Sequence, residues 1–493
     1  MKKVNKVVIV GGGTAGWMTA ASLAKLLGNN FELELVESEQ IGTIGVGEST
    51  VPTLSTLHQL LKIDERDFVS AVHGTFKLGI SFENWRDVDQ DYFHSFGWTG
   101  NDCWAAGFQH FWLKGRELGI SADYGDYCLE LMAAKQKKFA VPQGEGLNYA
   151  YHIDSGLYAS MLRKIANAHG CKRTEGKITQ VGTNPDTGFI EYVELESGQK
   201  VAGDLFVDCS GFSALLIEKT LKTGYEDWTH WLPCDRAIAV QTEALRAPVP
   251  YTRAIARSAG WQWRIPLQSR VGNGYVYSSQ FQSDDDALRL LLDNIQGKTL
   301  IEPNHLRFRT GQREQHWNKN CVAVCLSSGF IEPLEATSIH LIQRAIIWLM
   351  QLFPRDQICQ PDIDEFNQKM KHECEHIRDF IILHYHVTSR RDTEFWRYCA
   401  NMSLPDSLSH RIDLFKETAR AFHVPGELFT ENSWTQVMLG QGIMPEQYHP
   451  IVNMMGNQDL NVFLANIKST VGQQSAQLPG HQDFIDHYCK AMV

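Results

Sequence analysis

The sequence predicts a mixed α/β fold in which a Rossmann-like dinucleotide-binding module is interleaved with a second β-sheet and followed by a helical C-terminal region. At the start of the chain, a β-branched strand runs into a glycine turn and then a helix, as such modules begin. Alternating apolar and polar residues over 261–281 indicate antiparallel strands. From about residue 361 the pattern is mostly helical. We therefore expect the module and the interleaved sheet over residues 1–355 and the helical region over residues 356–493.

The other elements follow from hydrophobic periodicity and from turn signals at glycine and proline. We expect strands at residues 7–10, 31–36, 178–181, 189–195, 205–207 and 321–326. We expect helices at residues 17–27, 54–72, 157–168 and 339–352. The strand at 205–207 runs into small residues and would return the chain to the nucleotide site. The aromatic-rich stretch from Phe76 to Trp112 predicts no clear element.

The composition is that of a folded protein. Of 493 residues, 43% are hydrophobic and 21% are charged, which argues against a disordered, collagen-like or coiled-coil chain. There are 57 acidic and 46 basic residues, a net charge of −11, and no long basic block. Nucleic acid is therefore not an expected partner.

The cysteines and the apolar runs bear on the cellular compartment. Eleven cysteines are scattered from Cys103 to Cys489 without a CxxC pair, and no secretory signal precedes them. We therefore expect no disulfide framework and no metal site, and a cytoplasmic location. The apolar run from Ala345 to Met350 is far shorter than the ~20 residues of a membrane helix. No membrane span is expected.

Gly11, Gly13 and Gly16 form a GxGxxG turn between the first strand and the first helix. Glycine there permits the tight turn, the close approach of a pyrophosphate and the packing of the helix on the strand. Glu37, about twenty residues on, stands where an acid accepts hydrogen bonds from a ribose hydroxyl. The pattern predicts dinucleotide binding without choosing between NAD and FAD. No second such turn follows a strand, so if FAD occupies the first, no obvious NAD(P)H site remains.

Four motifs carry a resemblance to a known family: GGGTAGWM at 11–18, GVGESTVP at 45–52, WQWRIP at 261–266 and GFIEPLEAT at 329–337. They resemble the flavin-dependent tryptophan halogenases, and the similarity extends from residue 5 to about residue 400. The WxWxIP motif is the most specific of the four, because it separates these halogenases from related flavin hydroxylases.

The resemblance implies that FAD occupies the glycine turn and that a separate flavin reductase supplies it as FADH2. The reduced flavin reacts with oxygen to a C4a-hydroperoxide, which chloride or bromide attacks to give hypohalous acid. That acid then travels to a separate pocket and halogenates an electron-rich arene such as tryptophan or an indole. The implied cofactor-binding residues are Gly11, Gly13, Thr14, Ala15, Gly16, Glu37, Gly47, Ser49 and Gly329.

The family's catalytic lysine and glutamate match Lys77 and Glu335. Phe76, Leu78 and Ile80 surround the lysine in the sequence and would favour its neutral amine, which can hold hypohalous acid or form a haloamine. A carboxylate can stabilise the arenium ion and accept its proton. Without the resemblance, Lys77 would be interpreted as a surface lysine and Glu335 as an acid at a helix start.

The resemblance also implies a halide site at Thr337 and Ser338, whose backbone N–H groups lie at the start of a helix. An ordinary Ser/Thr helix cap is compatible with the same residues. The commoner family pattern is Glu-Ser-Thr-Gly, whereas this chain has Glu335-Ala-Thr-Ser338. The missing glycine leaves the preferred halide open.

Aromatic residues are expected between the flavin and the substrate. Trp261 and Trp263 share one face of their strand, which Pro266 would end. Such a pair is usually part of the core, whereas the resemblance makes the two indoles a tunnel wall. His94 and Phe96 match positions near the substrate, although a structural histidine and core packing explain them equally. No C-terminal counterpart of the family's amino-acid-binding tyrosines is evident, so free tryptophan and indole both remain candidates.

Two alternatives to a halogenase stay open. An FAD-dependent aromatic hydroxylase would bind its own NAD(P)H and insert oxygen directly. WxWxIP, Lys77 and Glu335 argue against it. A catalytically silent nucleotide-binding protein would use the glycine turn for structure alone.

Overall fold

The computed structural model describes residues 3–42, 47–141 and 146–491. A six-stranded sheet in the order β20-β21-β12-β1-β2-β8 forms the dinucleotide module. Its strands pair in parallel except for β20, which is antiparallel to β21. They are β1 (Lys6–Val10), β2 (Glu32–Glu37), β8 (Lys172–Glu175), β12 (Leu205–Asp208), β20 (Trp317–Asn318) and β21 (Cys321–Ala323). The predicted Rossmann-like opening is confirmed, and β12 returns beside β1 as expected.

A seven-stranded sheet in the order β18-β14-β17-β16-β15-β5-β6 interleaves with this module along the chain. All pairs are antiparallel except β15 with β5. Its strands are β5 (Gly79–Asp87), β6 (Gln90–Ser95), β14 (Arg236–Glu243), β15 (Thr252–Arg257), β16 (Gly260–Pro266), β17 (Arg270–Tyr277) and β18 (Asn304–Arg307). Part of the unassigned aromatic stretch therefore supplies β5 and β6.

The antiparallel strands predicted over 261–281 are present as β16 and β17. The sequence pattern also predicts that Gly272 and Gly274 separate the two strands, and this is wrong. Gly272 and Gly274 lie inside β17. Gly274 is opposite Trp263, and a Cβ there would lie 2.0 Å from the indole. The glycine is therefore needed to seat an aromatic ring across the strand pair.

Three small sheets complete the β structure. They comprise β3 (Glu48–Ser49), β7 (Ala150–Ile153) and β4 (Thr75–Lys77); β9 (Ile178–Thr183), β10 (Ile190–Leu195) and β11 (Lys200–Ala202); and β13 (Tyr225–Asp227), β19 (Gly311–Arg313) and β22 (Gly329–Phe330). β7 lies between β3 and β4, so it brings the GESTVP motif beside the strand that carries Lys77.

The predicted helices are present, with one correction, and further helices lie between them. They are α1 (Thr14–Leu27), α2 (Leu54–Leu60), α3 (Glu65–Ala71), α4 (Phe108–Glu117), α5 (Leu129–Lys135), α6 (Ser155–Ala168), α7 (Asp284–Asp293), α8 (Ser338–Gln351), α9 (Gln360–His386), α10 (Glu394–Asn401), α11 (Asp406–Thr418), α12 (Glu431–Gly440), α13 (Asn457–Gln477) and α14 (His481–Tyr488). The helix predicted at 54–72 is two helices, because Lys62 adopts φ +48° and Asp64 caps a new start. The strand predicted at 321–326 ends at Ala323, before a 3₁₀ turn at Cys325–Ser327.

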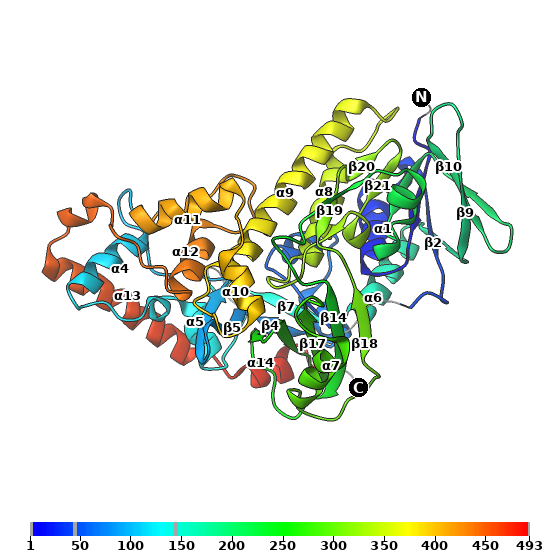
Figure 1. Cartoon of the computed structure of the whole chain (residues 1–493). Helices are drawn as coiled ribbons and strands as arrows, with labels where there is room; N and C mark the ends of the chain where they lie inside the picture. Colours follow the sequence, from blue (N-terminus) through cyan, green and yellow to red (C-terminus); the bar gives the residue numbers. More distant parts are fainter. Residues whose placement is uncertain (1–2, 43–46, 142–145, 492–493) are drawn as a thin grey trace.

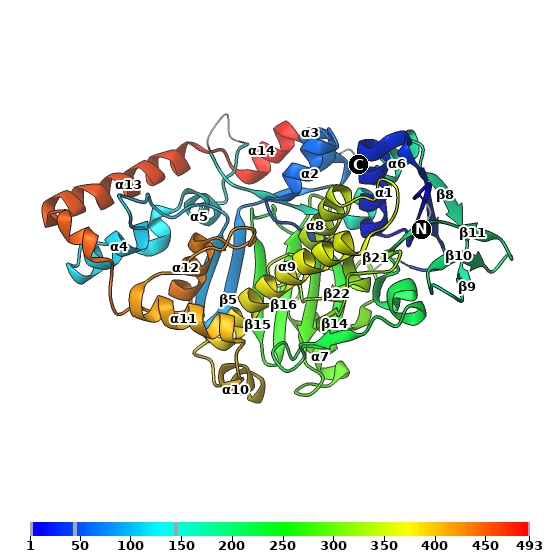
Figure 2. The same cartoon turned by 90° about the horizontal axis from the view of Figure 1, so that it is seen from above.

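Helix α9 crosses one face of the seven-stranded sheet (Figure 2) and buries a core against it. Phe82 and Trp261 of the sheet pack in that core with Phe380 and Tyr385 of the helix. Helices α4, α11, α12 and α13 gather at one end of the molecule, and β9 and β10 lie at the other (Figure 1). The sequence-based boundary at residue 355 stays a prediction.

In the described parts of the chain, no helix combines the length and the apolar character needed to cross a membrane.

Candidate active site

The glycine turn leaves one open face. A Cβ on Gly11, which has φ +115°, would lie 2.2 Å from the carbonyl oxygen of Cys209. A Cβ on Gly16 would lie 1.9 Å from the carbonyl oxygen of Gly11. By contrast, no heavy atom lies within 4 Å of the place where Gly13 would carry a Cβ. Gly11 and Gly16 therefore close the turn, and Gly13 leaves room for a ligand.

The start of α1 faces this space without a side-chain cap. Thr14 is the first helical residue, and its N-cap, Gly13, makes no side-chain hydrogen bond to the first turn. The free N–H groups and the positive helix end suit a pyrophosphate. Glu37 ends β2 beside Gly12, and Arg173 Nε donates to its carboxylate at 2.5 Å.

A cavity of about 750 Å³ runs from the glycine turn to the seven-stranded sheet. Its size is that of a cofactor site. Predicted residues that line it are Gly11, Gly13, Thr14, Ala15, Glu37, Gly47, Ser49, Trp261, Trp263 and Ser338. Together with the open glycine face and the uncapped helix, this lining fits the expected FAD. Gly329 instead packs against the carbonyl oxygen of Gly311, and Gly45 and Val46 lie outside the described residues.

The two tryptophans of WQWRIP form part of the cavity wall. Their ring centroids lie 6.1 Å apart, so both indoles do share one face of β16, as predicted. Trp261 is buried, and its Nε1 donates to Glu332 Oε2 at 2.7 Å. Pro266 is the last residue of β16, and its carbonyl oxygen accepts from the Thr75 hydroxyl at 2.7 Å.

Residues 332–338 contribute side chains to two different sites. Pro333, Leu334, Ala336 and Ser338 line the cofactor cavity. Glu332 and Glu335 are fully buried and instead contact consecutive residues of α9. Tyr385 Oη donates to Glu332 at 2.6 Å, and His384 Nε2 lies 3.0 Å from Glu335 Oε1. One short segment therefore separates the cavity from a second, buried site.

Lys77 lies in that second site with no exposed surface. Its Nζ donates to the Thr50 carbonyl at 3.1 Å and lies 4.9 Å from the centre of the Phe96 ring. Burial lowers the pKa of Lys77 to about 7, against the attraction of the Glu335 carboxylate. A surface position is excluded, and a large share of the lysine is a neutral amine at neutral pH.

Glu335 is held by two histidines. Nδ1 of His94 lies 2.9 and 3.0 Å from its two oxygens, and His384 approaches from α9. Burial alone would raise the pKa of Glu335, but the two imidazoles lower it to about 2. The group is therefore a carboxylate at neutral pH. It precedes α8 by three residues, so it is not an acid in the first turn of that helix.

His384 and Tyr92 were not identified from the sequence. The Tyr92 hydroxyl contacts His384 Nδ1, and burial lowers the pKa of His384, which favours its neutral form. His384 Nε2 makes no well-aligned hydrogen bond to the described residues, but it lies 3.0 Å from the Glu335 carboxylate, whose negative charge favours the ring proton on Nε2. Tyr92 then donates to Nδ1 and fixes this tautomer. No local motif signals a contact between residues 292 apart in the chain.

The predicted halide residues lie between the two sites. Thr337 is the N-cap of α8, yet its side chain makes no capping hydrogen bond. Its buried Oγ1 has no partner among the described residues. An ordinary Thr cap is therefore not what the geometry provides. Ser338, the first residue of α8, faces the cofactor cavity.

Comparisons with known proteins agree with this arrangement. The family model described as tryptophan halogenase matches residues 6–457. The solved structure of Xcc4156, a flavin-dependent halogenase from Xanthomonas campestris, is 55% identical with a TM-score of 0.98 and covers 100% of both chains. BrvH, a flavin-dependent halogenase from Brevundimonas sp. BAL3, is 42% identical with a TM-score of 0.94, covering 98% of this chain and 99% of that one. The tryptophan 6-halogenase SttH from Streptomyces toxytricini is 35% identical over 84% of each chain.

The chain belongs to the tryptophan halogenase family. The predicted resemblance is confirmed, and with it a flavin-dependent halogenase in preference to the hydroxylase or the silent binding protein. For this tryptophan halogenase family member, the roles of individual site residues stay predictions.

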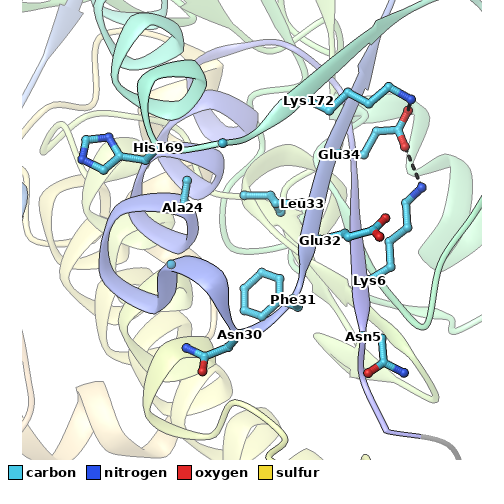
Figure 3. Close-up of a pocket in the computed structure, with 12 residues that line it drawn as sticks. Asn5, Lys6, Ala24, Asn30, Phe31, Glu32, Leu33, Glu34, His169 and Lys172 are labelled. Carbon is cyan, nitrogen blue, oxygen red and sulfur yellow. Dashed lines mark hydrogen bonds and ion pairs between the residues drawn. The ribbon is translucent and has the colours of Figure 1, made fainter.

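A second hollow of this halogenase lies at the opposite end of the Rossmann sheet, where β1, β2 and β8 begin (Figure 3). Inside it, Glu34 is buried between Lys6 and Lys172, at 2.7 and 3.1 Å. Ligands of open parallel sheets bind at the carboxyl ends of the strands. These charges satisfy one another, so the hollow has no evident part in the chemistry.

Within residues 3–42, 47–141 and 146–491, no cluster of three or more His, Cys, Asp or Glu side chains is placed to hold a metal ion.

The open face of Gly13 gives a first prediction. Gly13→Ala meets no atom of the protein, so the variant should keep the wild-type melting temperature and lose affinity for FAD, because its methyl group enters the ligand's space. Gly16→Ala, the matched control, should lose stability by a few kcal/mol through its clash with Gly11. Calorimetry and FAD titration separate these effects. Equal destabilisation by both substitutions would contradict the assigned geometry.

Burial of Lys77 gives a second prediction. The folded state holds a largely neutral amine from about pH 7 upward, whereas the unfolded chain keeps its proton until about pH 10.5. The stability of the wild type should therefore rise between these pH values. Lys77→Met should raise the free energy of unfolding at pH 7 by a few kcal/mol, with a smaller gain at pH 10. Urea unfolding at both pH values measures this, and no gain at pH 7 would contradict it.

Proposed function

We propose that this flavin-dependent halogenase uses FADH2, oxygen and chloride or bromide to form hypohalous acid and to halogenate an electron-rich arene such as indole or tryptophan. The observation that carries the proposal is that Lys77 and Glu335 are both fully buried. Glu335 belongs to the segment 332–338, other residues of which line the cofactor cavity. Oxidant generation and ring substitution would then occur on opposite sides of one protein segment.

The bound reduced flavin, with oxygen, supplies the oxidising equivalents that convert halide to hypohalous acid. At the end of the cavity, the N–H groups that begin α8 and the unpartnered Thr337 hydroxyl can hold the halide. Trp261 and Trp263 line the cavity, where they would keep the arene away from bound flavin. This exclusion disfavours direct oxygen insertion.

Lys77 is the proposed acceptor of hypohalous acid. With a pKa of about 7 it offers a neutral amine, which can hold the acid by a hydrogen bond or form an N–halogen bond with release of water. In the second case, the arene takes the halogen and the lysine nitrogen regains a proton. Either path delivers the halogen from a fixed position.

Glu335 is the proposed partner of the arene. Its carboxylate, placed between the two imidazoles, can stabilise the positive charge of the arenium ion and accept the ring proton. His94 and the tyrosine-linked His384 hold both of its oxygens in place. The low pKa of Glu335 keeps it ionised before each turnover.

The substrate class follows from the aromatic surroundings. Phe96 lies over Lys77, and Phe380 and Phe429 lie near His94 at ring-centroid distances of 5.5 and 6.2 Å. Such rings suit a flat arene. SttH is named a tryptophan 6-halogenase, which favours an indole ring. Tyr448, in the C-terminal region, packs against a cluster that includes residues of α4 and α13.

We propose that a separate flavin reductase delivers the reduced cofactor. The sequence has a single strand-linked GxGxxG turn, and that turn belongs to the FAD-sized cavity. NADH without a reductase should therefore not support turnover.

A bromination assay tests the proposal. The protein is incubated with FAD, a flavin reductase, NADH, oxygen and bromide, and indole and tryptophan are offered separately. Mass spectrometry should detect the bromine isotope doublet on at least one arene. Lys77→Met and Glu335→Gln should each lower product formation by about 100-fold or more. Lys200→Met, which removes an exposed lysine, is the matched control and should keep wild-type activity.

Three results would contradict the proposal. An oxygenated product without bromine would indicate the hydroxylase. Unchanged, equally regioselective bromination by Lys77→Met would remove the lysine from the mechanism. Turnover driven by NADH alone would remove the separate reductase.

A further inference from the structure

A buried chain of hydrogen bonds leads from the cofactor cavity into the protein. Ser49 Oγ lies 2.9 Å from Thr252 Oγ1, which lies 2.9 Å from His152 Nε2. On the other side of the imidazole, His152 Nδ1 lies 2.9 Å from Thr75 Oγ1. Thr75 Oγ1 in turn lies 2.7 Å from the carbonyl oxygen of Pro266. All four side chains are at least nine-tenths buried.

The Pro266 carbonyl sets the direction of every bond in this chain. A carbonyl oxygen only accepts, so the one hydroxyl proton of Thr75 must point to it. Thr75 then accepts from His152 Nδ1–H, which leaves Nε2 as an acceptor. Thr252 uses its only proton to donate to Nε2 and accepts from Ser49.

The protonation state of His152 supports these hydrogen-bond directions. Burial, with the nearby Lys77 and His481, holds the pKa of His152 well below its usual range. The imidazole is therefore neutral and carries one proton, at Nδ1. A doubly protonated ring, which could reverse the chain, is disfavoured by the same burial.

Ser49 therefore has no proton left for a ligand. Both Ser49 and Thr252 line the cavity, and Thr252 belongs to β15 of the seven-stranded sheet, where it is paired with Ile80 of β5. With the pyrophosphate at the start of α1, that end of the cavity suits the flavin ring. The Ser49 oxygen offers only lone pairs there.

We propose that Thr75, His152 and Thr252 hold Ser49 as an obligate hydrogen-bond acceptor, which makes the site prefer reduced over oxidised FAD. Two-electron reduction turns a flavin ring nitrogen that only accepts hydrogen bonds into an N–H donor, so an acceptor facing that nitrogen would stabilise the reduced form over the oxidised one. The inference rests on the proposed FAD site. Thr75, His152 and Thr252 act as positioning residues, since Ser49 is the member that would meet the cofactor.

The test is the ratio of dissociation constants for oxidised and reduced FAD, measured by fluorescence titration, with anaerobic titration for the reduced form. The wild type should bind reduced FAD more tightly. Thr75→Val frees His152 to move its proton to Nε2, which reverses the chain and turns Ser49 into a donor. The preference should then fall by about tenfold, the size of one net hydrogen bond. Thr75→Ser keeps the hydroxyl and should keep the ratio.

Ser49→Ala provides an independent arm. This substitution removes the acceptor without offering a donor, so the variant should lose the preference for reduced FAD. Its affinity for oxidised FAD should not exceed that of Thr75→Val. A wild type without preference, or equal ratios in Thr75→Val and Thr75→Ser, would overturn the inference and leave halogenase activity intact as a proposal. A wild type that binds neither flavin would instead contradict the proposed cofactor and the inference with it.

Discussion

The arrangement of both sites depends on the segment from Glu332 to Ser338, which contributes residues to each of them. Its apolar residues complete the wall of a cavity shaped for a dinucleotide, while its two glutamates point into the core under α9. The carboxylates need polar partners there, because a buried charge without them is costly. Consecutive residues of α9, His384 and Tyr385, supply these partners. One helix therefore contacts both the segment that forms the cavity wall and the carboxylate of the proposed halogenation site.

The burial of Lys77 opposes stability and serves chemistry. An amine with no exposed surface, whose Nζ donates to the Thr50 carbonyl, is forced toward its neutral form. The fold tolerates this because the sheets and α9 bury large apolar cores around it. Glu335 differs, since two imidazoles stabilise its charge. The pair thus places a neutral amine near a carboxylate that stays ionised at neutral pH. The burial of Lys77 lowers stability, as is common where a site is arranged for activity.

Local sequence patterns predicted much of this fold, whereas features that depend on contacts between residues far apart in the chain were not predicted. The glycine turn, the shared face of Trp261 and Trp263, and most helices follow from short-range periodicity. The strands in the aromatic stretch were missed because the residues there show no clear local periodicity, although β5 and β6 form a hairpin. His384 and Tyr92 were missed because their contact joins residues 292 apart in the chain. Lys77 and Glu335 were identified only through resemblance, since spacing alone cannot show that two distant side chains share one buried site.

The central claim is that the halogen passes from the cofactor cavity to the arene inside the protein, by way of Lys77. Competition between indole and a polymer-bound phenol, which cannot enter a buried site, tests it most directly. The account predicts that the wild type brominates indole and spares the polymer, and that Lys77→Met shifts bromine to the polymer. Bromination of the polymer by the wild type as fast as that of indole would mean freely diffusing hypobromous acid and would contradict the account.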